Sequence, residues 1–281
     1  MDLPDIEILE TLAGGGGDAS VELVRAAGRL LVLKRHRLRD IAAERAFHEA
    51  LRRHDLPSLK IETFSGLGPD QILLEYVPGS PTIGGSPTPD LCRRWGGAVG
   101  ALHQIRFEHC AVLDERGKLE STPWPDFITG KISEAIGRAS GSDLPPSLLD
   151  QAEARLAQLL AFEPAGFVLT HGDLHLNNAL VRGEEVVLFD KPAGVWAAPP
   201  VFDLCLVFSE GFPGARYGAD REGDAERLDA FIEGYGQLPA EHDRWLEHFV
   251  LLRALRRYPS PFVPEMRAII EIALDRINSP R

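Results

Sequence analysis

The chain has 281 residues, of which 44% are hydrophobic and 26% charged, a composition that excludes disordered or collagen-like chains. Its 30 basic and 42 acidic side chains give a formal net charge of −12, which excludes a general binder of nucleic-acid backbones because such proteins need clustered Lys and Arg. The same excess of acid favours a small ligand that carries positive charge.

Residues 1–77 are predicted to form a lobe of β-strands with one helix. Apolar runs bounded by turn residues predict strands at 6–9, 21–24, 30–34, 60–64 and 71–77. The run Gly14–Gly17 lies between the first two strands, where a turn is expected. The helix follows the third strand, with Asp40 as its candidate N-cap and apolar residues at the helical spacing of Ala43, Ala46, Phe47, Ala50 and Leu51.

From Pro78 onward the pattern changes. The segment 78–87 is rich in Pro and Gly, so we place there the boundary between an N-terminal lobe, 1–77, and a C-terminal lobe, 78–281. Beyond it, apolar spacing predicts helices at 91–102, 241–257 and 266–277 and short strands at 167–170, 179–181 and 186–189. The sequence therefore predicts a two-lobed α+β fold, with a small antiparallel β-sheet and one helix in the first lobe and a larger, mainly helical second lobe.

The polar loop from His171 to Asn178 and the strand after it carry the residues with the clearest chemistry. Asp173 and Asn178 stand five positions apart, and Asp190 ends an apolar strand twelve positions later. A carboxylate can accept a proton from an incoming nucleophile, while an amide oxygen and a second carboxylate are hard ligands that suit Mg²⁺. Phosphoryl transfer needs this combination of a positioned base and metal ions on the phosphates.

The pattern His-Gly-Asp-x-x-x-x-Asn, followed by a strand that ends in Asp, resembles the aminoglycoside phosphotransferase and choline kinase family. These proteins are small-molecule kinases with a protein-kinase-like fold. The resemblance implies that Asp173 is the catalytic base and that Asn178 and Asp190 hold Mg²⁺. It further implies that His171 supports the loop and that Asp203 braces it through its backbone.

Segments of the N-terminal lobe resemble the same family in the same order. Lys34, at the end of an apolar strand, is similar to the lysine that contacts the phosphates of ATP. Its expected ion-pair partner is Glu44, with Glu49 as the alternative if the helix register differs. Gly15 and Gly16 stand where the family cradles the phosphates.

The segment that ends the N-terminal lobe resembles the family's hinge, so the backbone of Glu75 and Val77 is expected to bind adenine. The helical segments 98–103 and 231–235 also resemble family helices, and the matches extend from about Gly14 to Tyr235. Agreement in order over most of the chain is stronger evidence than any single motif.

Two departures from the family pattern leave points open. The glycine run is not GxGxxG, so which glycines contact phosphate is open. The segment after Asp190 reads Lys-Pro-Ala-Gly and lacks the second acidic residue of many relatives, so the number of metal ions, one or two, is also open.

Two other classes of function compete with the kinase. His171, Asp173 and His175 alternate, so in an extended segment they would line one face and could bind the metal ion of a metallohydrolase. A pseudokinase would keep Lys34 and Asp190 and bind nucleotide without transferring phosphate.

The resemblance implies an ATP-dependent phosphotransferase that moves the γ-phosphoryl group to a hydroxyl of a small molecule. The family and the acidic balance favour an aminoglycoside-like antibiotic or an amino sugar as the acceptor, and hence a role in antibiotic resistance. A metabolite such as choline or homoserine is the alternative. Nothing in the sequence distinguishes ATP from GTP.

The expected partners are ATP, Mg²⁺ and the hydroxyl-bearing acceptor, with no nucleic acid and no membrane, in a monomer or homodimer. Cys92, Cys110 and Cys205 form no CxxC pair, so we expect reduced thiols. The sequence shows no signal segment and no apolar run of the ~20 residues needed to span a bilayer, so we expect a cytoplasmic protein.

Overall fold

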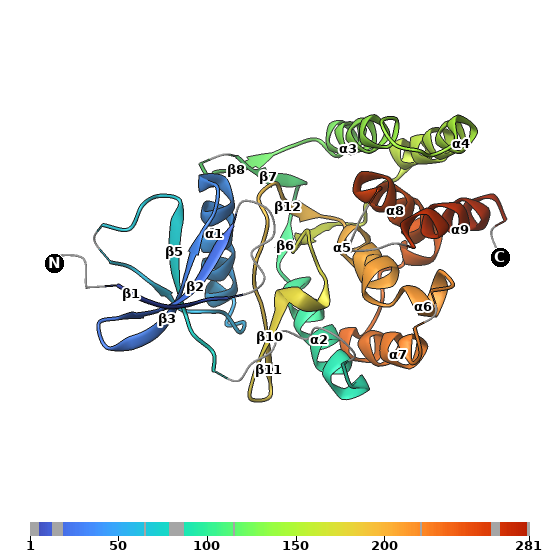
Figure 1. Cartoon of the computed structure of the whole chain (residues 1–281). Helices are drawn as coiled ribbons and strands as arrows, with labels where there is room; N and C mark the ends of the chain where they lie inside the picture. Colours follow the sequence, from blue (N-terminus) through green and yellow to red (C-terminus); the bar gives the residue numbers. More distant parts are fainter. Residues whose placement is uncertain are drawn as a thin grey trace.

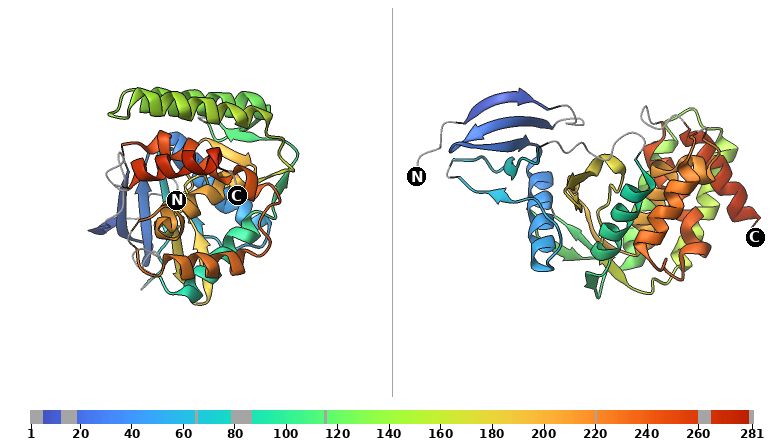
Figure 2. Two further views of the ribbon diagram at one scale, coloured as in Figure 1. Left: turned by 90° about the vertical axis from the view of Figure 1, so that its right-hand side faces the viewer. Right: turned by 90° about the horizontal axis from the view of Figure 1, so that it is seen from below.

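The computed structural model describes residues 6–12, 19–64, 66–78, 87–114, 116–219, 221–259 and 265–279. An antiparallel sheet and one helix form one end of the molecule, and the remaining helices form the larger part at the other end (Figure 1). The view from below separates the same two parts (Figure 2). The predicted α+β fold, with a small sheet-bearing part and a larger helical part, is confirmed.

The first sheet contains five antiparallel strands. In spatial order they are β1 (Glu7–Thr11), β2 (Ser20–Ala26), β3 (Arg29–Arg35), β5 (Gln71–Glu75) and β4 (Ile61–Glu62). All five predicted strands are present, but those predicted at 60–64 and 71–77 are shorter than expected. The register places Lys34 of β3 opposite Ile72 of β5, so this lysine lies in the centre of the sheet.

Helix α1 (Leu38–Arg53) packs against this sheet and buries Glu44 together with its apolar stripe. The prediction that Asp40 is its N-cap is wrong, because the helix begins two residues earlier, after Arg37. Asp40 lies in the first turn, and its carboxylate accepts a hydrogen bond of 3.1 Å from the backbone N–H of Ala193. The residue therefore ties the start of α1 to the segment that follows Asp190.

The larger part contains eight α-helices in the described residues, with the three predicted helices confirmed among them. They are α2 (Pro89–Leu102), α3 (Trp124–Ala139), α4 (Pro146–Leu156), α5 (Pro200–Leu206), α6 (Pro213–Arg216), α7 (Asp224–Tyr235), α8 (His242–Arg257) and α9 (Met266–Asn278). Their apolar faces form one continuous core, in which Trp95, Phe231 and Phe249 are buried. None of the helices in the described ranges is long and apolar enough to cross a membrane.

A second small sheet supports the loop that carries Asp173. Its strands, in spatial order, are β6 (Arg106–Phe107), β9 (Phe167–Leu169), β12 (Val195–Ala198), β7 (Ala111–Leu113) and β8 (Leu119–Ser121). The sequence predicted only β9 of these five, because strands of two to four residues leave too short a pattern to recognise. The predicted hairpin is also present, as β10 (Ala179–Arg182) and β11 (Glu185–Leu188).

The two parts of the molecule meet through the hairpin. Val187 of β11 packs in one apolar cluster with Ile72 and Leu74 of β5 and Ile41 of α1. Because side chains alternate along a strand, Val186 and Leu188 point to the other side, toward α2. The hairpin is therefore held between the first sheet and the helical part, and Asp190 follows directly from it.

Candidate active site

The loop between β9 and β10 is fixed by a buried carboxylate. Asp203, in the first turn of α5, accepts hydrogen bonds from the backbone N–H of His171 at 2.6 Å and of Gly172 at 2.8 Å. The Nε2 atom of His103 lies 3.4 Å from the same carboxylate. Burial would raise the pKa of Asp203, but these hydrogen bonds and the charge of His103 lower it, so the group stays ionised. Gly172 has φ of +81°, which permits the turn that the two bonds require.

His171 points into the protein core. Its Nε2 atom lies 2.7 Å from the carbonyl oxygen of Phe189, and its ring meets Phe47 edge-on at 5.4 Å. Burial lowers the pKa of His171, so the ring is neutral and donates its Nε2 proton to that carbonyl. The side chain thus connects the loop to the residue before Asp190.

The metallohydrolase alternative is wrong. The positive φ of Gly172 breaks the extended conformation on which it depended, so His171, Asp173 and His175 do not line one face. His175 instead donates to Asp173. Over the described ranges, no group of three His, Cys, Asp or Glu side chains is arranged to hold a metal ion.

Both carboxylate oxygens of Asp173 are held by neighbours. Arg253 of α8 donates from Nη2 to Oδ1 at 2.7 Å, and His175 donates from Nε2 to Oδ2 at 3.0 Å. Asn178 approaches Oδ2 at 3.3 Å. Burial alone would raise the pKa of Asp173, but the hydrogen bond from His175 and the charges of His175, Arg253 and Arg257 hold it well below the usual range.

Asn178 lies between Asp173 and the end of the hairpin. Its amide nitrogen donates to the backbone oxygen of Asp173 at 2.8 Å, and its own backbone oxygen accepts from the N–H of Phe189 at 3.1 Å. Because Asp190 directly follows Phe189 in the chain, the second bond brings Asn178 close to Asp190. Asp190 has a φ of +60°, and its side chain is 43% exposed.

Lys34 joins the first sheet to this segment. Its Nζ lies 2.6 Å from Oε2 of Glu44 and 2.5 Å from Oδ1 of Asp190. Burial would lower the pKa of Lys34, but the two carboxylates raise it above its ordinary value, so the lysine stays charged. Desolvation would raise the pKa of Glu44, yet the charge of Lys34 lowers it to about 2. The alternative Glu49 is half-exposed and pairs with Arg53 instead.

The residues of the expected adenine site lie at the end of β5. The backbone N–H of Glu75 donates to the backbone oxygen of Lys60 at 2.9 Å. Its carboxylate pairs with Arg182 of β10 at 2.5 Å. Val77 packs against the apolar cluster that joins β5 to the hairpin. Gly15 and Gly16 lie outside the described residues.

Sequence reasoning missed Arg253 and its partner Glu210. Glu210 lies in a π-helical turn, Val207–Gly211, and accepts from Nε of Arg253 at 2.9 Å and from Arg257 at 2.9 Å. The last two turns of α8 carry three arginines, Arg253, Arg256 and Arg257, with Ala254 and Leu255 between the first two. A basic residue inside an apolar helical stripe was the available signal, since buried arginine requires a carboxylate partner.

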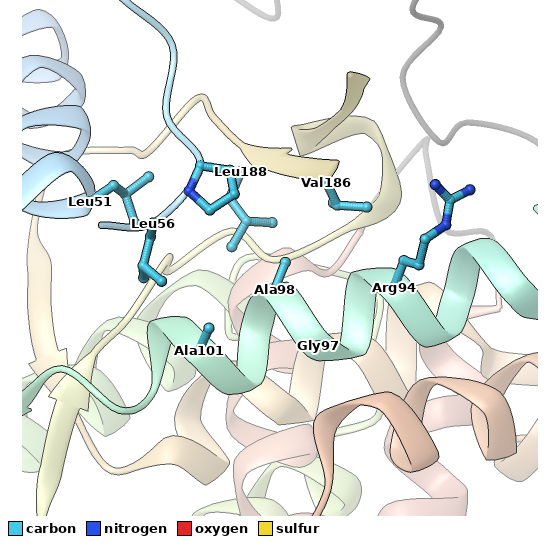
Figure 3. Close-up of a pocket in the computed structure, with 9 residues that line it drawn as sticks. Leu51, Leu56, Arg94, Gly97, Ala98, Ala101, Val186 and Leu188 are labelled. Carbon is cyan, nitrogen blue, oxygen red and sulfur yellow. The ribbon is translucent and has the colours of Figure 1, made fainter. Parts of the chain in front are cut away.

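An apolar cavity of about 230 Å³ lies between the end of α1, helix α2 and strand β11 of the hairpin. In Figure 3, Ala98 and Ala101 of α2 face Leu51, Leu56 and Leu188 across it. Its remaining lining comes from Pro57, Arg94, Gly97 and Val186. Among the described residues, its lining includes no carboxylate and neither Asp173 nor Asp190.

A two-part fold with a buried lysine–glutamate pair, a braced His-Gly-Asp loop and an aspartate after the following hairpin is that of a protein-kinase-like small-molecule kinase. The model of the phosphotransferase enzyme family (APH) matches residues 9–248. The chain belongs to this family and is an enzyme that transfers phosphoryl groups to small molecules. A search of curated protein sequences finds no match.

Solved structures of several kinases share the fold. Macrolide 2'-phosphotransferase MphH from Brachybacterium faecium is 22% identical, with a TM-score of 0.58, and the match covers 99% of this chain and 94% of that one. A candidate fructosamine-3-kinase from Thermobifida fusca is 20% identical, with a TM-score of 0.64 and coverage of 98% and 96%. A thermostable mutant of aminoglycoside phosphotransferase APH(4)-Ia, in ternary complex with AMP-PNP and hygromycin B, is 15% identical, with a TM-score of 0.68 and coverage of 98% and 93%.

Proposed function

We propose that the protein transfers the γ-phosphoryl group of ATP to a hydroxyl group of a small molecule, with Asp173 facing that hydroxyl and Lys34 facing the phosphates. The observation that carries the proposal is the ion pair of Lys34 with both Glu44 and Asp190, next to a loop that presents Asp173. The structure of the APH(4)-Ia mutant contains the ATP analogue AMP-PNP together with hygromycin B, which supports ATP as the donor. Residues 1–77 act as the nucleotide-binding lobe, and residues 78–281 act as the catalytic and acceptor-binding lobe.

In the reaction, the bond between the γ-phosphorus and the β–γ bridging oxygen of ATP breaks, ADP leaves with that oxygen, and a new bond forms from the γ-phosphorus to the acceptor oxygen. Asp173 orients the acceptor hydroxyl and receives its proton. Because Arg253 and His175 stabilise the ionised carboxylate, Asp173 is a weak base. A weak base suits this chemistry, since phosphoryl transfer depends more on positioning and charge than on early proton removal.

The residues beside Asp173 fit a divalent cation. The amide nitrogen of Asn178 donates to Asp173, which leaves its amide oxygen for a ligand, and Asp190 is half-exposed beside it. Carboxylate and amide oxygens are the donors that Mg²⁺ prefers. Asn178 and Asp190 would hold Mg²⁺, which when bound neutralises charge on the phosphates.

Lys34 is paired and charged before any nucleotide arrives. A buried ammonium held by Glu44 is oriented in advance, so little further ordering is needed when it contacts a phosphate oxygen. In this arrangement Asp190 shares the lysine, and it would exchange that partner for the metal ion and the phosphates. His171 and Asp203 support the loop through the bonds described above. The carbonyl oxygen of Glu75, whose N–H is already bonded to Lys60, and the backbone of Val77 would contact adenine.

The proposal is tested by incubating the protein with Mg-ATP and a panel of hydroxyl-bearing compounds. The panel includes aminoglycosides, macrolides, amino sugars, sugar acids, choline and homoserine, with GTP as a second donor. A mass gain of one phosphoryl group in any acceptor supports the proposal. Nucleotide binding without transfer to any member would instead indicate the pseudokinase alternative. In cells, we expect a cytoplasmic monomer or homodimer, and antibiotic resistance if the acceptor is an antibiotic.

A further inference from the structure

Two arginines of α8 lie beside the group that faces the acceptor. Arg253 bridges Asp173 at 2.7 Å and Glu210 at 2.9 Å, and its side chain is 13% exposed. Arg257 lies one helical turn further on and shares Glu210 at 2.9 Å. The carboxylates of Asp173 and Glu210 are therefore both paired with arginines of α8.

The same helix continues the positive charge toward α3. Arg256 donates to Glu134 of α3 at 3.1 Å, and Lys131 of α3 lies 3.3 Å from the other oxygen of that carboxylate. Arg138 lies 3.9 Å from Glu134 as well. We call Lys131, Arg253, Arg256 and Arg257 the α3–α8 basic cluster.

Positive charge is in excess here. Three acids, Asp173, Glu134 and Glu210, are paired with the cluster's four cations, and Arg138 adds a fifth cation beside Glu134. Burial lowers the pKa of Lys131, and repulsion from Arg256 lowers it further. Over the described chain, the Nε atoms of Arg256 and Arg257 meet no hydrogen-bond acceptor. These features are those of a site that lacks an anion.

We propose that the acceptor carries a negatively charged group, such as a carboxylate, near the hydroxyl that is phosphorylated, and that the α3–α8 basic cluster binds this group. The inference rests on the proposed function, because it takes Asp173 as the residue that faces the hydroxyl. A polycationic acceptor would place its charges beside arginines and find the acids already paired, which costs affinity.

The inference reverses the expectation drawn from the net charge of −12. Charges further apart than the screening length of roughly 8 Å at physiological salt interact weakly. The charged side chains close to the acceptor therefore decide which sign of charge on the acceptor is favoured. Around Asp173 that set is basic, although the whole chain is acidic. Whole-chain charge is therefore a poor guide to the acceptor of this enzyme.

The first test compares acceptors that share a sugar ring and differ in charge: D-glucuronate, D-glucose and D-glucosamine, with hygromycin B as a larger cationic compound. With Mg-ATP, we expect phosphoryl mass gain to be fastest with D-glucuronate. Faster transfer to D-glucosamine or hygromycin B would overturn the inference while it supports the proposed function. If no compound is phosphorylated, the result counts against the proposed function. The inference is then decided by the calorimetric binding test below.

The binding test uses charge reversal and needs no transfer. By calorimetry with AMP-PNP present, the double variant Lys131→Glu/Arg256→Glu should bind hygromycin B at least about tenfold more tightly than the parent chain. The control, Arg25→Glu/Arg53→Glu, changes net charge by the same amount at exposed positions of β2 and α1. If hygromycin B affinity rises no more than in the control, the inference fails. Should the reversed variant not fold, Lys131→Gln/Arg256→Gln should give a smaller gain in the same direction.

Discussion

The ammonium of Lys34 lies 2.6 Å from the carboxylate of Glu44, and this pair is buried between the first sheet and α1. The glutamate orients the lysine, so its loss should leave Lys34 to pair with Asp190 alone. We expect Glu44→Gln to lower kcat by at least about tenfold and to raise the KM for Mg-ATP, measured by steady-state phosphoryl transfer. The matched control is Glu49→Gln on the same helix, which should leave both constants unchanged. Equal effects of the two substitutions would contradict the assignment of Glu44.

Asp173 is the residue assigned to the acceptor hydroxyl. The isosteric change Asp173→Asn keeps the size of the side chain but removes its ability to accept a proton, and we expect turnover to fall by about 10²–10⁴-fold. Affinity for Mg-AMP-PNP, measured by calorimetry, should stay near that of the parent protein. Turnover at the parent rate would show that Asp173 does not act at the transferring group.

Asp203 accepts two backbone hydrogen bonds in a fully buried position. An asparagine there would turn an N–H group toward one of these donors, so Asp203→Asn should lower the free energy of unfolding by roughly 2–4 kcal/mol and reduce transfer as the loop loosens. Urea denaturation measures the first effect. Asp229→Asn, at an exposed position of α7, should change stability by no more than about 0.5 kcal/mol. A stable and active Asp203→Asn protein would refute the bracing role.

Helices α2 and α7 approach too closely for side chains at Gly96. A Cβ there would lie 2.1 Å from the backbone oxygen of Phe231, so Gly96→Ala must push the helices apart and should cost several kcal/mol. The adjacent Gly97 provides the control, because its Cβ would meet its nearest neighbour at 3.7 Å. Gly97→Ala should stabilise the protein by about 0.5–1 kcal/mol through helix propensity. Thermal unfolding of the two variants should therefore shift in opposite directions.

His248 of α8 should make stability depend on pH. Burial, reinforced by the charge of Arg155, lowers the pKa of His248 from 6.5 to about 4 in the folded protein. Between pH 6.5 and 4, His248 is protonated in the unfolded chain but neutral in the folded protein. Lowering the pH through this range therefore favours the unfolded state, and the free energy of unfolding falls. The loss is at most about 3 kcal/mol. Urea denaturation between pH 4 and 6.5 measures the free energy of unfolding as a function of pH. His248→Gln should weaken this pH dependence, while His109→Gln, at an exposed position, should leave it unchanged. The same pH dependence in the parent and the His248→Gln proteins would contradict the prediction.

The order of the chemistry-bearing segments was predictable from the sequence, because each belongs to a short local pattern. Lys34 ends an apolar strand, Asp173 and Asn178 share one loop, and Asp190 ends the next hairpin. Helical spacing likewise predicted α2, α8 and α9. Local patterns failed where the element was very short, as in the second sheet, and where a helix began before its expected cap, as at Asp40.

By itself, the sequence determined which residue types were available for phosphoryl transfer and the family to which the chain belongs. Only the tertiary structure decided which glutamate meets Lys34, since one turn of helix separates a buried position from an exposed one. It alone brought Arg253 to Asp173 across 80 positions of chain. The sign of the charge around the acceptor depends on such long-range pairs, because electrostatic interactions follow distance in space and not position in the sequence.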